Sequence, residues 1–421
     1  MITAGDSVIL KNIEVISFSF LSYDAIAKSE MNYFLKYNIL VGDANTMIHS
    51  EGGSDVIKIG NENYYIIDRV ASRASSSQTS ISSAQIFYSI SDNFIAGDAK
   101  NLLYSIGGDD AIYVGNNIVF DVGSITSLST ISRSATSSVS VEFSFSGNNL
   151  LGDASLMKHS QGGDDVINVC NNFTSNVGQV TANGVGAKSS YVLNFTLSDN
   201  NLYGDAETMI HSKGGDDTLS IGVGIVGDSP FTLNVFNNTL YGDAKTMQKS
   251  SGGNDILTGA DGKGSITYLY GDAQFTDGKS KAGDDKLISG QGNDQMWGDF
   301  GSVVSPVVAS NDDDEDDEDD DHESEHDDDG DDDHCSSNIN KYAGKDTFVF
   351  AANNGKDTIF DFQHGLDKID LSALGSIHGL NDLIFAPSTT QPLDSVIDLG
   401  DGNSITLVGV NNLEATDFVF A

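Results

Sequence analysis

Hydrophobic and polar residues alternate along most of the chain before residue 300. Stretches rich in β-branched and aromatic residues, with partial period-2 alternation, are typical of β-strands. Long stretches of this kind lie at 86–95, 141–151, 191–203 and 231–241. Shorter ones lie at 56–59, 111–114, 166–169 and 218–221. Because no helix-period pattern of useful length is present, the sequence predicts an all-β protein.

Ser and Thr dominate some of the segments between these predicted strands, as at 71–83 and 129–138. Clusters of small polar residues between periodic segments usually form loops. We therefore expect these segments to form polar turns on the far side of the paired strands.

The same region contains an internal repeat. A Gly-Asp-Ala triplet recurs, and each copy is followed by a Gly-rich turn that ends in a second aspartate, at the same offset in five copies and a slightly longer one in the sixth. The spacing between successive triplets shrinks towards the end of this region. A fixed offset within a variable period predicts a solenoid, in which a rigid turn joins strands of adjustable length. The paired aspartates are Asp43 and Asp55, Asp98 and Asp110, Asp153 and Asp165, Asp205 and Asp217, Asp243 and Asp255, and Asp272 and Asp285.

Three further positions keep their place in the repeat. The apolar residue two places after the second aspartate is predicted to point into the core, as Ile57, Ile112, Ile167, Leu219, Leu257 and Leu287. The fourth residue after the first aspartate is predicted to plug the edge of the roll, as Met47, Leu102, Met157, Met209 and Met247. The sixth is histidine in three copies and is expected to be an exposed ladder rather than a metal site, at His49, His159 and His211, with Tyr104 and Lys249 in other copies.

The chain is strongly acidic, with 62 Asp and Glu against 21 Lys and Arg and a formal net charge of −41. This charge argues against nucleic acid or anionic lipid as a main partner and favours cations. Residues 312–333 are almost entirely acidic and include no Lys or Arg, so we expect a disordered acidic linker at 301–341. The two cysteines, Cys170 and Cys335, exclude a disulfide framework and a four-cysteine zinc site.

Turns that combine Gly and Asp can supply the oxygen ligands of a calcium ion. Glycine reaches backbone conformations that turn carbonyl oxygens inward, and aspartate adds a short carboxylate. Ca²⁺ takes six to eight oxygen ligands, which carbonyls and carboxylates supply. The alternative is a Gly/Asp turn without metal, since both residues favour turns. Six copies at a nearly fixed offset favour calcium over that alternative.

These turns resemble the RTX, or haemolysin-type calcium-binding, family, whose nonapeptide is GGxGxDxUx with U apolar. The clearest match is the run GQGNDQMWGD at 290–299, and the step from Asp285 to Asp294 has the length of one nonapeptide. The resemblance implies a parallel β-roll with elongated strands and several Ca²⁺ ions between successive coils. It implies metal ligands at the twelve paired aspartates and at Gly290, Gly292, Asp294 and Asp299.

The run KDTFVFAANNGKDTIFDFQHGLDKIDLSALG at 345–375 resembles the C-terminal domain of serralysin-type secreted proteins. The resemblance implies a cap module that closes the roll, with its aspartates on turns or strand ends, namely Asp346, Asp357, Asp361, Asp367 and Asp370. It also implies that 411–421 is an uncleaved C-terminal signal for a type I secretion channel. The N-terminus lacks the features of a cleaved secretory signal peptide, so we expect an extracellular protein exported through that channel.

One motif has the form of a zinc-protease site. His322, Glu323 and His326 satisfy HExxH, but they lie within the acidic run, which is a poor helix former, and the extended protease pattern fails. We interpret this motif as a decoy and expect no enzymatic activity. No apolar run approaches the length of a membrane-spanning helix.

The predicted organisation has four parts: first strands at 1–36, calcium-binding repeats at 37–300, the linker at 301–341 and the cap module at 342–421. We expect a secreted calcium-binding protein of structural or adhesive type, which folds on Ca²⁺ outside the cell and contacts a cell surface, a matrix or further copies of itself. The alternatives are an RTX hydrolase and a cytolysin. The first needs a catalytic domain and the second an apolar helical region upstream of the repeats.

Overall fold

The computed structural model describes residues 7–10, 15–23, 26–74, 79–129, 134–228, 230–304, 342–386 and 393–421. Within them the chain is all-β, as predicted, with two 3₁₀ turns at Leu380–Asp382 and Ala415–Asp417 and no α-helix. Accordingly, none of the described segments forms a helix with the length and apolar character of a membrane span.

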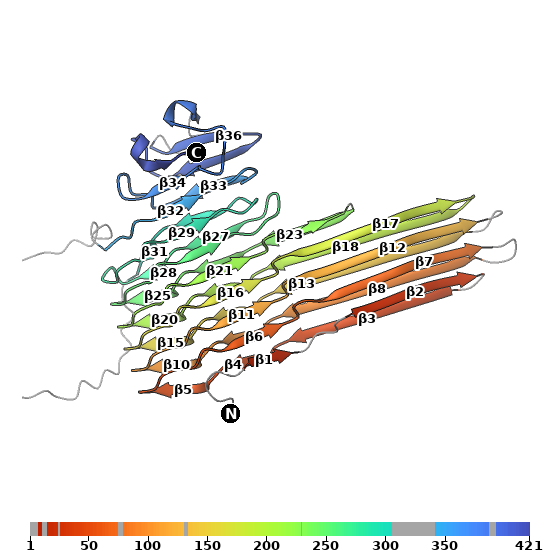
Figure 1. Cartoon of the computed structure of the whole chain (residues 1–421), viewed down its shortest axis with the longest axis horizontal. Helices are drawn as coiled ribbons and strands as arrows, with labels where there is room; N and C mark the ends of the chain where they lie inside the picture. The colour runs from red at the N-terminus through yellow and green to blue at the C-terminus, as the bar shows by residue number, and fades with distance from the viewer. Residues whose placement is uncertain are drawn as a thin grey trace, which may run out of the picture.

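The chain winds into a parallel β-solenoid whose coils follow one another from the N-terminal to the C-terminal end (Figure 1). A full coil has five strands. One example runs through β8 (Ser80–Ser91), β9 (Phe94–Ala96), β10 (Ala99–Leu103), β11 (Ala111–Val114) and β12 (Ile118–Ser129). Each strand pairs in parallel with its counterparts in the neighbouring coils, which confirms the predicted β-roll.

Two sheets form the body of the roll. The first roll sheet contains β1 (Ser7–Leu10), β6 (Val56–Ile59), β11, β16 (Val166–Val169), β21 (Thr218–Ile221), β26 (Ile256–Thr258), β29 (Lys286–Ile288), β32 (Thr347–Val349), β34 (Lys368–Asp370) and β38 (Phe418–Val419). The second roll sheet contains β4 (Ile39–Val41), β9, β14 (Asn149–Leu151), β19 (Asn201–Tyr203), β24 (Asn238–Tyr241), β27 (Thr267–Tyr270), β30 (Gln295–Trp297), β33 (Lys356–Ile359), β37 (Asn403–Leu407), β36 (Ser395–Gly400) and β35 (Ile384–Ala386).

A third sheet, the lobe sheet, is built from the insert between the two aspartates of each repeat. It contains β5 (Ala44–Ile48), β10, β15 (Ala154–Lys158), β20 (Ala206–Ile210), β25 (Ala244–Gln248), β28 (Ala273–Thr276) and β31 (Phe300–Val303). It forms one long edge of the molecule (Figure 1).

Two long sheets, the blade sheets, extend from the opposite edge (Figure 1). One contains β2 (Val15–Tyr23), β7 (Tyr64–Ala74), β12, β17 (Phe173–Asn183) and β22 (Val226–Gly227). The other contains β3 (Ile26–Lys36), β8, β13 (Ala135–Ser146), β18 (Ala187–Ser198) and β23 (Phe231–Phe236).

The apolar positions of the repeat fill two interiors. The residues two places after the second aspartate are buried between the roll sheets, as predicted. The predicted plugs are buried too, but they form a separate cluster inside the lobe, with a row of alanines from the triplets. Because side chains alternate between the two faces of a strand, each strand directs its apolar residues either between the roll sheets or into the lobe.

The Ser/Thr-rich segments were expected to be far-side turns, and for the described residues this was wrong. Ser72, Ser82 and Ser137 lie in the long blade strands and are buried. Their hydroxyls are satisfied across the blade: Ser82 Oγ donates to the Ala71 carbonyl at 2.8 Å and Ser137 Oγ to the Thr126 carbonyl at 2.7 Å. A small hydroxyl side chain that finds a carbonyl partner fits a thin sheet-on-sheet interior.

The C-terminal strands continue the solenoid. β32, β34 and β38 extend the first roll sheet, and β33 and β37 extend the second. Antiparallel pairing among β35, β36 and β37 then ends the stack. β31 extends to Val303, so the strand enters the range expected for the linker. The acidic run and the HExxH motif lie outside the described residues.

Candidate metal centre: two rows of aspartates

The repeated aspartates lie at the two ends of the lobe insert, where the chain enters and leaves the lobe sheet. Stacking of the coils aligns each kind into a row. The entry row contains Asp43, Asp98, Asp153, Asp205, Asp243, Asp272 and Asp299. The exit row contains Asp55, Asp110, Asp165, Asp217, Asp255, Asp285, Asp346 and Asp367.

Each entry-row carboxylate closes the neck of its own lobe. It accepts a hydrogen bond from a glycine N–H at the other end of the insert. The N–H of Gly108 donates to Asp98 at 2.8 Å, and that of Gly253 donates to Asp243 at 2.8 Å. The fixed offset between the paired aspartates therefore reflects a lobe of constant length.

Exit-row carboxylates link successive coils. From Asp110 onward, one oxygen of each accepts a hydrogen bond from the backbone N–H of the aspartate one coil earlier. Asp165 accepts from Asp110 at 2.6 Å, Asp217 from Asp165 at 2.6 Å and Asp255 from Asp217 at 2.7 Å. The second oxygen is buried without a hydrogen-bond partner in Asp110, Asp165, Asp217, Asp255 and Asp285.

Glycines leave no room for a side chain around these oxygens. A Cβ on the triplet glycine Gly152 would lie 1.8 Å from Asp165 Oδ2, and one on Gly107 would lie 1.6 Å from Asp153 Oδ1. In the next layer, a Cβ on Gly215 would lie 1.7 Å from the carbonyl oxygen of Gly163. The turn therefore requires glycine because backbone and carboxylate oxygens approach one another closely.

Burial and mutual repulsion disfavour charge on both rows. Burial raises the pKa of Asp110 to about 9, and the charge on Asp98 adds to this effect. Burial raises the pKa of Asp98 to about 7, although hydrogen bonds from Asp153 and the Gly108 N–H oppose it. For Asp217, burial raises the pKa well above the ordinary value, with the charge on Asp165 as the next cause. Without a counter-charge, the folded rows therefore favour protonated carboxyl groups.

The donor set fits a hard cation. Ca²⁺ prefers carboxylate and carbonyl oxygens, and the rows provide buried carboxylate oxygens without donors beside glycine carbonyls. In the described part of the chain, no three His, Cys, Asp or Glu side chains form a group that could hold a metal ion by themselves. Backbone carbonyls would have to complete the ligand set. The exit-row aspartates Asp110, Asp165, Asp217, Asp255 and Asp285 would hold Ca²⁺ together with the entry row.

Three predicted ligands lie elsewhere. Gly290, Gly292 and Asp294 belong to the loop between β29 and β30, on the edge opposite the lobe. Asp294 accepts a hydrogen bond from the Gly290 N–H at 2.9 Å, and its own N–H donates to Asp357 at 2.8 Å. Asp294 Oδ1 is buried without a partner. The sequence placed these residues with the other turns, but the structure assigns them to a separate candidate site with Asp357.

The exit row is longer than the repeat search indicated. Asp346 and Asp367 continue it, although the serralysin-like motif had placed them only on turns or strand ends. Burial raises the pKa of Asp346 to about 11, with the charge on Asp285 as the next cause. Their signal was the same Gly-x-Asp triplet, at 344–346 and 365–367, without the preceding Gly-Asp-Ala.

The expected histidine ladder is present at the tip of the lobe. The ring centroids of Tyr104 and His159 are 4.9 Å apart, as are those of His159 and His211, and both pairs are nearly parallel. His49 stacks on Tyr104 at 5.2 Å. As expected from the sequence, all four rings are exposed, and they lie apart from the aspartate rows.

Comparison with known proteins identifies the family. Among curated proteins, none matches the chain. The family model described as the serralysin C terminal of peptidase M10 matches residues 112–398, which include the repeats from Asp153 onward and the C-terminal strands as far as β35. The resemblance predicted from residues 345–375 is therefore confirmed and extends far upstream of them. Since the match covers more than half of its length, this chain belongs to the serralysin C-terminal family of peptidase M10.

Proposed function

We propose that this protein is a secreted RTX-type protein that binds several Ca²⁺ ions along the aspartate rows and folds when it binds them outside the cell. Its role is structural or adhesive. The observation that carries the proposal is the series of buried exit-row oxygens without hydrogen-bond partners, repeated from coil to coil beside the triplet glycines. Membership of the serralysin C-terminal family supports it.

The mechanism follows from the charge on the rows. When deprotonated, buried carboxylates such as Asp205 and Asp217 repel one another and favour the unfolded chain. Bound Ca²⁺ supplies positive charge that offsets this repulsion. Because only the folded coils bring the two rows together, cation binding stabilises the folded state by mass action.

The proposed extracellular location follows from the same coupling between Ca²⁺ binding and folding. An RTX-type chain that stays unfolded at the low Ca²⁺ concentration of a cytosol can pass through a type I secretion channel. At the roughly millimolar Ca²⁺ for which extracellular sites are tuned, it folds. The C-terminal residues 411–421 are the proposed secretion signal, and β38 within them pairs with β34.

Isothermal titration calorimetry of the full chain tests the binding step. We expect several Ca²⁺ ions to bind in the micromolar to millimolar range and Mg²⁺ to bind much more weakly, because Mg²⁺ demands a compact octahedral site. No Ca²⁺-specific heat from a chain with β-type circular dichroism would overturn the proposal.

We propose that the chain has no catalytic activity of its own. The repeat coils and the cap strands account for most of its length, and the HExxH motif lies within the acidic run. Casein hydrolysis measured with and without a zinc-specific chelator tests this, and chelator-sensitive cleavage that His322→Ala abolishes would contradict it.

A further inference from the structure

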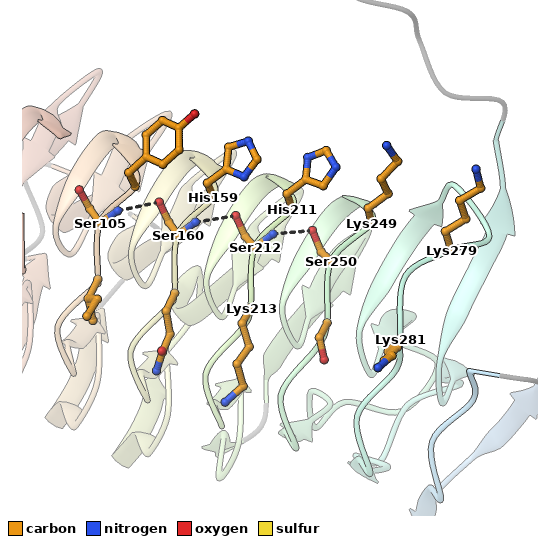
Figure 2. Close-up of a pocket in the computed structure, with 14 residues that line it drawn as sticks. Ser105, His159, Ser160, His211, Ser212, Lys213, Lys249, Ser250, Lys279 and Lys281 are labelled. Carbon is orange, nitrogen blue, oxygen red and sulfur yellow. Dashed lines mark hydrogen bonds between the residues drawn. The ribbon is translucent and has the colours of Figure 1, made fainter. Parts of the chain in front are cut away.

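A basic groove lies along the tip of the lobe, apart from the aspartate rows. Its volume is about 780 Å³, and it crosses several coils (Figure 2). One wall is the exposed row of Tyr104, His159, His211, Lys249 and Lys279, and the other wall includes Lys213 and Lys281. The floor is a row of buried serines, each of which accepts a hydrogen bond from the backbone N–H of the serine one coil earlier, as in Ser105 to Ser160 at 3.2 Å.

The charge of the groove opposes that of the molecule. The chain carries a net charge of −41, yet the groove is lined by four lysines and no acidic residue. Within the described residues, none of the four ammonium groups forms an ion pair. Exposed lysines in an acidic protein are ordinarily available to its own carboxylates, so four unpaired ammonium groups on the two walls of one groove favour an anionic ligand.

The backbone at this wall has the same positive φ in four successive coils. Tyr104, His159, His211 and Lys249 have φ between 46° and 52°, in the left-handed region that favours Gly or Asn. The same conformation occurs at other corners of the coils, for example at Asp92 and Asp199, so it belongs to the solenoid turns in general. Figure 2 shows the side chains of His159, His211 and Lys249 pointing outward from the tip in register from coil to coil.

The rings offer their edges rather than their faces. Since Tyr104, His159 and His211 stack face to face at 4.9 Å, the inner faces are covered by neighbouring rings. Single-stranded nucleic acid is bound mainly by stacking bases on open aromatic faces, which this wall lacks. Ring edges present a phenol hydroxyl and imidazole nitrogens, which suit the hydroxyl and acidic groups of a sugar chain.

We propose that this groove binds a linear acidic polysaccharide, with the lysines contacting its carboxylate or sulfate groups and the ring edges hydrogen-bonding its hydroxyls. The groove follows the stacking direction of the coils from Tyr104 to Lys281, so it fits an extended polymer rather than a compact ligand. The inference names a partner for the proposed extracellular adhesive role and rests on that role.

The chain itself carries a competing polyanion. Val304 is bonded to Thr276 and Tyr342 to Ala282, so both ends of the segment containing the acidic run are attached close to Lys279 and Lys281. The acidic run is therefore tested as a competitor for the groove. The test therefore compares the full chain with a variant in which residues 312–333 are replaced by Gly and Ser.

The test measures binding of three fluorescent probes by anisotropy, at fixed Ca²⁺ and about 0.1 M salt, where surface charges still interact. The probes are short oligogalacturonides, chondroitin sulfate oligomers and neutral dextran oligomers. We expect one or both acidic probes to bind and dextran not to bind. Changing Lys213, Lys249, Lys279 and Lys281 together to Gln should weaken binding about tenfold, since each exposed charge pair contributes modestly.

A matched control changes Lys188, Lys263, Lys286 and Lys356 to Gln, which removes the same charge from lysines outside the groove. It should bind like the unchanged protein. A second variant, His159→Asn with His211→Asn, keeps a residue that tolerates positive φ and should weaken binding by removing ring edges. Circular dichroism in Ca²⁺ confirms that each variant is folded, so a failure of calcium-dependent folding is distinguished from a failure of the groove.

Three results would overturn the inference. The first is no binding of either acidic probe, with or without residues 312–333. The second is equal losses in the groove and control variants. The third is tighter binding of oligodeoxythymidylate or polyaspartate than of the acidic sugars, which would identify a nucleic acid or an acidic protein segment as the occupant. Tighter polysaccharide binding once 312–333 is replaced would support the inference and identify the run as an internal competitor.

Discussion

At the scale of single residues, the repeated turn depends on glycines, because neighbouring oxygens occupy the space that a Cβ would need. Gly163 and Gly215 stack so closely that the carbonyl of one occupies the place of a Cβ on the other. The same contact recurs from Gly108 to Gly163 and from Gly215 to Gly253. A substitution at any of these glycines must therefore move backbone, which yields less readily than a side chain.

Gly215→Ala should lower the free energy of unfolding by about 1–3 kcal/mol, the usual cost of overpacking a rigid interior. Gly375→Ala is the matched control, because a Cβ there meets nothing within 4 Å. Urea denaturation in saturating Ca²⁺ measures both. Equal midpoints for the two variants would show that the glycine stack is not tightly packed.

A second residue-scale prediction concerns pH. Burial raises the pKa of Asp98 to about 7 and of Asp110 to about 9, whereas the pKa of an aspartate in an unfolded chain is about 3.9. Between those values the folded state binds more protons than the unfolded state, so stability without metal falls as pH rises from about 4 to about 9. In EDTA, the folded fraction measured by circular dichroism should increase when the pH is lowered from 8 to 5.

Calcium should reverse this trend, because the cation displaces protons from the same carboxylates. Its stabilising effect should therefore be larger at pH 8 than at pH 5. A folded fraction in EDTA that increases from pH 5 to pH 8 would show that the rows are not held together by protonation when the metal is removed.

At the scale of elements, each coil combines a lobe of nearly constant length with blade strands of variable length. From Asp43 to Asp285 the lobe insert changes by at most one residue, whereas the blade strands shorten from β17 and β18 to β22 and β23 and are then lost. The constant offset and shrinking period predicted this division correctly. The blade interior was less predictable. A Ser-rich segment has the composition of a loop, and buried serines such as Ser72 fit a strand here because hydroxyl partners lie opposite them.

Two adjacent aspartates of one turn allow the exit row to be tested. Asp217 is buried and Asp216 is exposed, and the position equivalent to Asp216 in the next coil is Asn254. Asp217→Asn keeps an acceptor for the Asp165 N–H but removes a buried charge. It should raise the folded fraction in EDTA and weaken Ca²⁺ affinity at least about tenfold.

Asp216→Asn is the control and should change neither quantity appreciably. Calorimetry and circular dichroism measure both variants under the same conditions. If Asp217→Asn binds Ca²⁺ as tightly as the unchanged chain, the exit row is a hydrogen-bond ladder alone and not a cation site.

At the scale of the whole molecule, stacking creates sites that no local pattern contains. The motif search correctly predicted the β-roll and the family, because each is encoded within one repeat; that the paired aspartates bind metal stays a prediction. It did not predict the basic groove, because only the wall with Lys249 follows a pattern in the repeat, whereas Lys213 and Lys281 share their position with Gln161 and Ser251. It also did not separate Asp294 from the lobe edge, since similar Gly/Asp turns serve both edges of the roll.

The central claim is that calcium controls folding, and the single tryptophan provides a direct probe of it. Trp297 is stacked between Tyr270 at 4.5 Å and Phe360 at 4.2 Å, and the three rings come from three successive coils. Its emission therefore depends on coil stacking. Ca²⁺ titration of the full chain at pH 7.5, followed by tryptophan emission and far-UV circular dichroism together, is the most direct measurement.

We predict a disordered spectrum with red-shifted emission in EDTA. Ca²⁺ up to about millimolar should produce a cooperative, EDTA-reversible change to a β-type spectrum with blue-shifted emission. Mg²⁺ at the same concentration should leave both signals unchanged. Identical signals in EDTA and in Ca²⁺ would contradict the account.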